Sequence, residues 1–153
     1  MRENLTLIAY ATRGGTTEEY AQAITSVLRN EFNIQADVIN LKNSRNPDVT
    51  QYHNIIVGAG IRMFRMHKEG AQFLEKTNFE EKNVGIFLSS LMPRDEAITR
   101  YINPLRQKNS TLQPIAVDVF GGRMRIFGRT SQDETNIEKA EEWTRTLAQS
   151  FQS

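Results

Sequence analysis

Short apolar runs alternate with helical patterns along the chain, and this alternation constrains the fold more than any other feature. The runs "NIIVGAG" and "VGIFLSS" are nearly continuous in apolar residues, as in parallel strands that are buried on both faces. Strands that alternate with helices predict a three-layer α/β fold with a five-stranded, parallel, doubly wound sheet. We expect its strands at Leu5–Tyr10, Gln35–Leu41, Asn54–Gly58, Asn83–Ser89 and Pro114–Phe120.

The first and last helices have the clearest patterns. Thr16 to about Phe32 carries an apolar stripe, and Thr16 followed by Glu19 has the spacing of a capping box, which would fix the helix start. The last helix is expected to begin near Ser131 or Asp133 and to run to the end of the chain.

The helices in the middle of the chain are shorter. One is expected at His67–Lys76, and another begins at Asp95 as its cap. Pro104 lies inside the second pattern and predicts a kink or a stop near Asn103. The segment "KNSRNPDVTQYH" shows only a short helical stretch around Asp48–Tyr52.

Composition excludes several classes of protein. The 153 residues predict one domain, residues 1–153, with 39% apolar and 24% charged residues. The absence of cysteine excludes disulfides, iron–sulfur clusters and thiolate zinc sites, and two isolated histidines predict no metal site. A net charge of +1 argues against nucleic-acid binding, and no apolar run is long enough for a membrane helix. A cytoplasmic location is expected.

Ligands of such sheets bind outside the carboxyl ends of the strands, near the point where the strand order reverses. The residues that directly follow the strands are therefore the candidates for a site. They are Thr12–Thr17, Gly58–Met66, Ser89–Asp95 and Gly121–Arg125.

The loop "TRGGTT" joins a strand to the N-terminus of a helix. Unpaired backbone N–H groups and the positive end of the helix dipole favour an anion there, and glycine lets the backbone approach it closely. Hydroxyls and an arginine suit the oxygens of a terminal phosphate. A capped helix after a tight turn would account for the same residues without any ligand. The candidate phosphate-binding residues are Thr12, Arg13, Gly14, Gly15, Thr16 and Thr17.

Other phosphate-binding folds do not match this loop. A P-loop needs a lysine after its second glycine, and the dinucleotide fingerprint G-x-G-x-x-G is absent. A phospho-acceptor receiver domain needs acidic residues after the first and third strands, which here end in "YATRGG" and "VGAGIR".

At this loop the chain resembles the flavodoxin family. The matching pattern is an aromatic residue, a hydroxyl residue, a small residue, a threonine and an alanine, with Ala9 as a departure because a larger apolar residue is usual there. The resemblance implies strand order 2-1-3-4-5 and non-covalent FMN, with its phosphate on Thr12–Thr17. The residues that carry it are Tyr10, Thr12, Gly15, Thr17 and Ala21, followed by Ile24.

Three stretches are also similar to the flavodoxin-like, menaquinone-dependent protoporphyrinogen oxidases: "YATRGGTTEE", "VGAGIRMFRMH" and "AVDVFGGRMR". That family has an extra basic, apolar segment after the last strand, whereas "GGRMRIFGRTSQDE" is expected to lead directly into the final helix. The Asp- and Tyr-containing loop of electron-carrying flavodoxins is also missing, because "SSLMPRDE" stands in its place.

A flavin ring needs apolar walls and donors facing its polar edge. Met63, Phe64 and Met66 on one side and Leu91 and Met92 on the other are expected to form the walls, although they could equally cover the top of the sheet. His67 lies close enough to be a further candidate. The candidate ring contacts are Gly60, Ile61, Arg62, Met63, Phe64, Ser89, Ser90, Leu91 and Met92.

Arginines gather near the same edge and predict a basic rim for an anionic substrate or partner. The function expected is electron transfer by an FMN-binding, flavodoxin-like redox protein that meets a redox partner protein or a small anionic or quinone substrate. Two alternatives stay open, a quinone-dependent, protoporphyrinogen oxidase-like flavoenzyme and a flavin-free interaction domain. The rim residues are Arg62, Arg65, Arg123 and Arg125.

Overall fold

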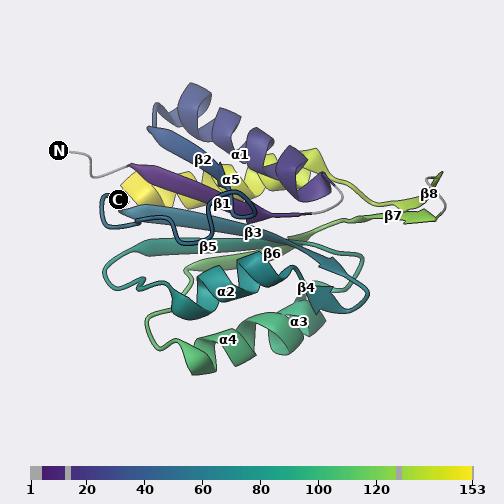
Figure 1. Ribbon diagram of the computed structural model, residues 1–153. Helices are drawn as coiled ribbons and strands as arrows, with labels where there is room; N and C mark the ends of the chain where they lie inside the picture. Colours follow the sequence, from purple (N-terminus) through teal and green to yellow (C-terminus); the bar gives the residue numbers. More distant parts are fainter. Residues whose placement is uncertain (1–4, 13–14, 127–128, 153) are drawn as a thin grey trace.

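Five parallel strands form the middle layer of the computed structural model, which describes residues 5–12, 15–126 and 129–152. They are ordered β2-β1-β3-β5-β6 (Figure 1). Because β4 is a short additional strand that pairs antiparallel with β3, this is the expected order 2-1-3-4-5, and the predicted fold class is confirmed. The strand bounds are Thr6–Ala11 for β1, Ala36–Asn40 for β2, Asn54–Arg62 for β3, Arg65–Met66 for β4, Asn83–Ser89 for β5 and Ala116–Phe120 for β6.

Helices cover both faces of the sheet (Figure 1). Alternate residues of β1 enter different cores: Ile8 and Tyr10 pack with residues of α1 and α5, whereas Leu7 and Ala9 pack with residues of α2, α3 and α4. The bounds are Thr16–Phe32 for α1, Lys68–Lys76 for α2, Arg94–Ala97 for α3, Asn103–Lys108 for α4 and Ile137–Gln152 for α5.

The connection from β2 to β3 contains turns and no helix, so the helical stretch expected at Asp48–Tyr52 is wrong. Asp48 Oδ1 accepts hydrogen bonds from the backbone N–H and the hydroxyl of Thr50, at 3.0 and 2.8 Å. Such local bonds compete with helix formation. The connection still closes the core, because Tyr52 is buried and donates its hydroxyl to Asp37 Oδ2 at 2.7 Å.

Helix α1 begins at Thr16 as expected, but the capping box is wrong. Its N-cap is Gly15, with φ of 83°, and no side chain caps the helix. The backbone N–H of Glu19 donates to the Gly15 carbonyl at 3.0 Å. Glycine takes the cap position because the chain must turn there through a conformation that disfavours a Cβ atom. The other expected cap is also displaced, since α3 begins at Arg94, before Asp95.

Pro104 neither stops nor clearly breaks its helix. A π-helical segment, Ile98–Ile102, joins α3 to α4, and Asn103 remains in the right-handed helical region. The wider turn precedes the residue that has no N–H to donate, so the helical path continues to Lys108 with a changed hydrogen-bond register.

A second hairpin follows β6, where a direct passage into the last helix was expected. β7, Arg123–Ile126, pairs antiparallel with β8, Arg129–Asp133, and the pair extends away from the main sheet (Figure 1). Helix α5 therefore begins at Ile137, later than expected. The Asn136 side chain accepts a hydrogen bond from the backbone N–H of Lys139 at 3.0 Å, as a helix cap does.

Candidate functional site

The loop between β1 and α1 lies at the carboxyl edge of the sheet. The backbone N–H of Gly15 donates to Thr12 Oγ1 at 3.3 Å. This bond joins the residue before α1 to the residue after β1. Thr16 and Thr17 open α1 and are both buried. Arg13 and Gly14 lie outside the described residues. The N-terminus of α1, where the first N–H groups have no partner within the helix, thus lies close to the Thr12 side chain, and such an arrangement favours an anion.

Strands β3 and β5 meet the first turn of α1 at the Thr17 hydroxyl. Thr17 Oγ1 donates to Ser89 Oγ at 2.9 Å, although 72 residues separate them. At Gly60, which ends the parallel part of β3, a Cβ atom would lie 3.2 Å from Thr17 Oγ1. Thr17 and Ser89 are both buried, so their hydroxyls satisfy each other at the centre of this edge. We call Thr17, Ser89 and Gly60 the polar junction.

The segment after β5 is fixed by hydrogen bonds to β6 and to its own serine side chain. The Ser90 N–H donates to the Phe120 carbonyl at 3.1 Å, and Ser90 Oγ accepts from the Met92 N–H at 3.0 Å. A Cβ atom on Gly122 would lie 3.3 Å from the Ser90 backbone, so the chain leaving β6 passes close to this segment. Leu91 and Met92 are half-buried, and Met92 packs against the core.

The segment after β3 is a tight hairpin. Arg62 of β3 pairs with Arg65 of β4, and Met63 and Phe64 form the two-residue turn between them. Met63 is 84% exposed and Phe64 is 67% exposed. The Arg100 guanidinium lies over the Phe64 ring, 5.0 Å from its centroid. We call residues 62–65 the hairpin tip. Its apolar side chains point outward, in contrast to Ile61, which is half-buried and packs against the core.

The structure brings together only part of the expected basic rim. Arg62 and Arg65 are exposed and directly opposite each other in the β3–β4 hairpin. Arg123 and Arg125 belong to β7, which follows β6 on the far side of β5, and their side chains lie outside what the structure describes. A rim made by all four arginines remains a prediction.

A buried glutamate, Glu69, lies next to His67, the residue that follows the β3–β4 hairpin. His67, whose N–H donates to the Gly60 carbonyl at 3.0 Å, places Nδ1 2.6 Å from Glu69 Oε2. Arg45 lies 3.7 Å from Glu69 Oε1. Burial favours the neutral acid, but a hydrogen bond from its own backbone N–H and the neighbouring His67 hold the pKa of the Glu69 carboxyl below its ordinary value. His67 was expected near the site; no sequence pattern pointed to Glu69.

Tyr20 of α1 forms hydrogen bonds with the segments before and after the β7–β8 hairpin. Its hydroxyl donates to the Gly121 carbonyl and accepts from the Asn136 N–H at 3.1 Å. Burial raises the pKa of Tyr20 above its ordinary value, although the Asn136 N–H opposes that shift. The position of Tyr20 within the helical pattern of Thr16 to Phe32 agrees with a buried ring, but nothing in the sequence indicated what its hydroxyl binds.

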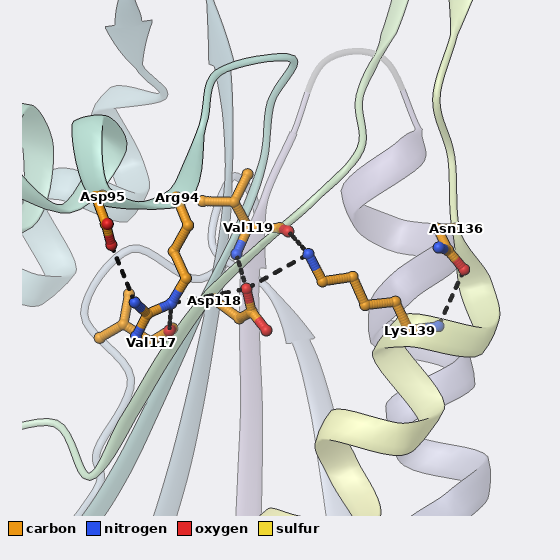
Figure 2. A network of polar contacts seen from close by, with 7 residues as sticks. All are labelled: Arg94, Asp95, Val117, Asp118, Val119, Asn136 and Lys139. Atoms are coloured by element: carbon orange, nitrogen blue, oxygen red, sulfur yellow. Dashed lines mark hydrogen bonds and ion pairs between the residues drawn. The ribbon is translucent and has the colours of Figure 1, made fainter.

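Side chains from two helices cover the outer edge of β6 (Figure 2). Arg94 Nε donates to the Val117 carbonyl and Lys139 Nζ donates to the Val119 carbonyl, each at 2.9 Å. Asp118 Oδ1 accepts from the Val119 N–H at 2.8 Å and lies 3.9 Å from Arg94 Nε and 3.6 Å from Lys139 Nζ. Because Arg94 directly follows the segment after β5, this network also fixes the far end of that segment.

The described part of the chain contains no cluster of three His, Cys, Asp or Glu side chains that could hold a metal ion. Among the helices that the structure describes, none is long and apolar enough to span a membrane.

Strand order and loop positions define the class: this is a doubly wound protein with the fold of the flavodoxins. A family model described as "Flavodoxin domain" matches residues 7–145, and the chain therefore belongs to the flavodoxin domain family. The chain is 32% identical over 126 residues to the protein named "Protoporphyrinogen IX dehydrogenase [quinone]" of Escherichia coli (strain K12). The aligned region covers 78% of this chain and 69% of that protein.

Solved structures agree on the fold. Oxidised flavodoxin 2 from Bacillus cereus has a TM-score of 0.67 at 20% identity, over 95% of this chain and 98% of that one. A flavoprotein from Lactobacillus acidophilus, solved in complex with FMN, has a TM-score of 0.57 at 15% identity, over 76% of this chain and 93% of that one. The expected resemblance is confirmed, and the fold is that of a flavodoxin-like flavoprotein.

Proposed function

We propose that this protein binds FMN and transfers electrons. The observation that carries the proposal is the loop at the start of α1, where Thr12 and the positive-φ Gly15 lie beside the unpaired N–H groups of a helix N-terminus. Backbone donors, a hydroxyl and a helix dipole together suit a terminal phosphate. Membership of the flavodoxin domain family supports the same ligand.

In this proposal the phosphate also draws on Thr17. The Thr17 hydroxyl donates to Ser89, and a charged phosphate oxygen is a stronger acceptor than a serine hydroxyl. Rotation of Thr17 toward the loop would leave Ser89 free to face the ring. Arg13, Gly14 and Thr16 remain proposed contacts of the phosphate.

The ring is proposed to lie between the segments that follow β3 and β5. Gly60 and Ile61 would contact one side and Leu91 and Met92 the other, with Ser89 and Ser90 near the polar edge. Arg62, Met63 and Phe64 belong to the same proposed set of ring contacts, and all three side chains are exposed. Bound FMN supplies the electron-carrying group, and the chain's residues hold it, orient it and limit its contact with water.

The test is the absorbance spectrum of the purified protein, with mass identification of any released chromophore. A flavin spectrum, the mass of FMN and tighter binding of FMN than of riboflavin are expected. A protein that takes up neither flavin would contradict the proposal and favour an interaction domain on this scaffold. The cytoplasmic location expected from the sequence belongs to the proposal and is checked by cell fractionation.

A second candidate function is oxidation of protoporphyrinogen IX with a quinone as electron acceptor. The 32% identity to the Escherichia coli enzyme favours it. FMN-loaded protein would be incubated anaerobically with protoporphyrinogen IX and a menaquinone, and porphyrin fluorescence followed. Fluorescence that rises with protein concentration would make the protein an enzyme, whereas no rise from protein that still exchanges electrons would leave it an electron carrier.

A further inference from the structure

A lysine side chain ties down the end of the connection between β2 and β3. This connection contains turns and no helix, although a crossover between parallel strands usually carries one. Tyr52, near its end, is buried and donates its hydroxyl to Asp37. The Tyr52 carbonyl accepts a hydrogen bond from Lys82 Nζ at 2.6 Å. Lys82 thus joins the end of the connection to the turn that precedes β5.

The surroundings of the Lys82 amine suit its neutral form better than those of a lysine in water. An ammonium group has three N–H donors, and one backbone carbonyl accepts a hydrogen bond from this half-buried side chain. Asp48 is near enough to favour the charge, but its Oδ1 accepts hydrogen bonds from Thr50 and not from Lys82. Burial outweighs the attraction of Asp48 and lowers the pKa of Lys82 below its ordinary value.

Lys139 shows the contrast. Its Nζ also donates to a backbone carbonyl, that of Val119, at 2.9 Å, but Asp118 Oδ1 lies 3.6 Å away and favours the charged form. Only the neutral amine has the lone pair that attacks an electrophile. The Lys82 amine has a neutral carbonyl as its partner and remains partly exposed, and this combination favours a nucleophilic lysine.

We propose that Lys82 is a site of acylation by acyl phosphates, and that its acylation loosens the connection between β2 and β3. The Lys82 nitrogen attacks the carbonyl carbon of the acyl phosphate, an N–C bond forms, and the C–O bond to the phosphate breaks. Phosphate leaves with the electron pair of that bond, and the amine proton passes to water. The product is a neutral amide, bulkier than the amine, at a point where the Tyr52 carbonyl lies 2.6 Å from the nitrogen.

This site is separate from the candidate flavin site. Lys82 directly precedes β5, and Tyr52 lies two residues before β3, so both belong to the amino-terminal edge of the sheet. The loop between β1 and α1 lies at the opposite edge. Acylation therefore acts on the connection without occupying the carboxyl edge, and the inference does not depend on FMN binding.

The test treats the whole chain with acetyl phosphate and follows the initial acetylation rate of each lysine by mass spectrometry. At neutral pH, Lys82 should react roughly threefold faster than the exposed Lys76 and Lys108. This preference should shrink as the pH approaches about 10.4, the ordinary pKa of lysine, because every amine becomes neutral there. Asp48→Asn removes the charge that favours the ammonium form and keeps an oxygen for Thr50, so it should accelerate acetylation of Lys82 about twofold.

Amide hydrogen exchange measures the consequence for the connection. In acetylated protein, residues 42–52 should exchange about threefold faster than in untreated protein. The matched control is Lys82→Arg, which keeps a positive charge and has no amine to acetylate, so the same treatment should leave exchange in its connection unchanged.

Three results would overturn the assignment of Lys82. They are acetylation no faster than at Lys76 and Lys108, a preference that persists at high pH and so reflects access alone, or slower acetylation in Asp48→Asn. Unchanged exchange of residues 42–52 after acetylation of Lys82 would contradict the loosening of the connection.

Discussion

The polar junction and the hairpin tip invert the usual distribution of side chains, although they are neighbours on β3. At the junction, the hydroxyls of Thr17 and Ser89 are buried and satisfy each other. At the tip, Met63 and Phe64 are held in the solvent by a strained turn. The contrast teaches that local packing does not explain this edge of the sheet, which keeps hydroxyls inside and large apolar side chains outside.

The largest effect is expected from the double change Thr12→Ala/Thr17→Ala. Hydrogen bonds to a charged group contribute about 1.5–3 kcal/mol each, so FMN should bind about 100-fold more weakly, while riboflavin, which has no phosphate, should change little. Flavin fluorescence titration measures both. Thr25→Ala is the control, because it removes a buried hydroxyl of the same helix whose bond, to the Ala21 carbonyl, is remote from the loop. Equal losses for both flavins would reduce the junction to a structural feature.

Charge reversal at the tip should have the next largest effect. Arg62→Glu/Arg65→Glu should slow oxidation of the reduced protein by ferricyanide about tenfold at low salt, and oxidation by a neutral quinone much less. Stopped-flow rates at several salt concentrations measure the difference, which should fade as salt rises. Arg106→Glu, near the end of α4 and so toward the opposite edge, should leave both rates as they are. Equal slowing for both acceptors, independent of salt, would show that the charges of Arg62 and Arg65 do not attract the anionic acceptor.

A smaller effect should appear in the stability of the FMN-free protein. Thr17→Val and Ser89→Ala remove the two partners of one buried hydrogen bond, so the double variant should lose less stability than the two single losses added together. A coupling of about 0.5–1.5 kcal/mol is expected from urea unfolding. Thr25→Ala combined with Ser89→Ala should be additive. Additivity in the first pair would show that the hydroxyls do not depend on each other.

The smallest effect concerns acid stability beneath the tip. The pKa of Glu69 is lower in the folded protein than its ordinary value, so its ionised form stabilises the fold above the unfolded-state pKa, and this contribution is lost as pH falls through the folded-state pKa. Glu69→Gln should therefore flatten the fall of stability in that acid window, followed by urea unfolding. Glu31, whose pKa is lowered by hydrogen bonds from Arg145, lies on the exposed surface, so Glu31→Gln should change the curve less. An unchanged slope in Glu69→Gln would contradict the assignment.

The sheet and the loop between β1 and α1 were predictable because they depend on local sequence patterns. Continuous apolar runs mark strands that are covered on both faces, and a strand followed by glycines and a helical stripe marks the loop at Thr12–Thr17. The direction of the side chains in that region was not predictable. Met63 and Phe64 face outward because only Arg65 and Met66 return to pair with β3, and two paired residues leave no readable pattern.

Errors at helix ends have the same origin. Thr16 and Glu19 have capping-box spacing, yet Gly15 takes the cap because the turn requires positive φ. The start of α5 was expected too early because Arg129–Asp133 pairs with a partner strand of four residues, and the cap at Asn136 lies beyond it. The Thr17–Ser89 contact spans 72 residues, so only the assembled sheet brings it together.

The covered edge of β6 has a consequence for how the protein meets other chains. Arg94 of α3 and Lys139 of α5 donate to the outer carbonyls of Val117 and Val119. An outermost strand is a template on which a strand of another molecule can pair, and it is a poor template where its outer carbonyls already accept hydrogen bonds from charged side chains. The two cations therefore protect this edge of the sheet against aggregation.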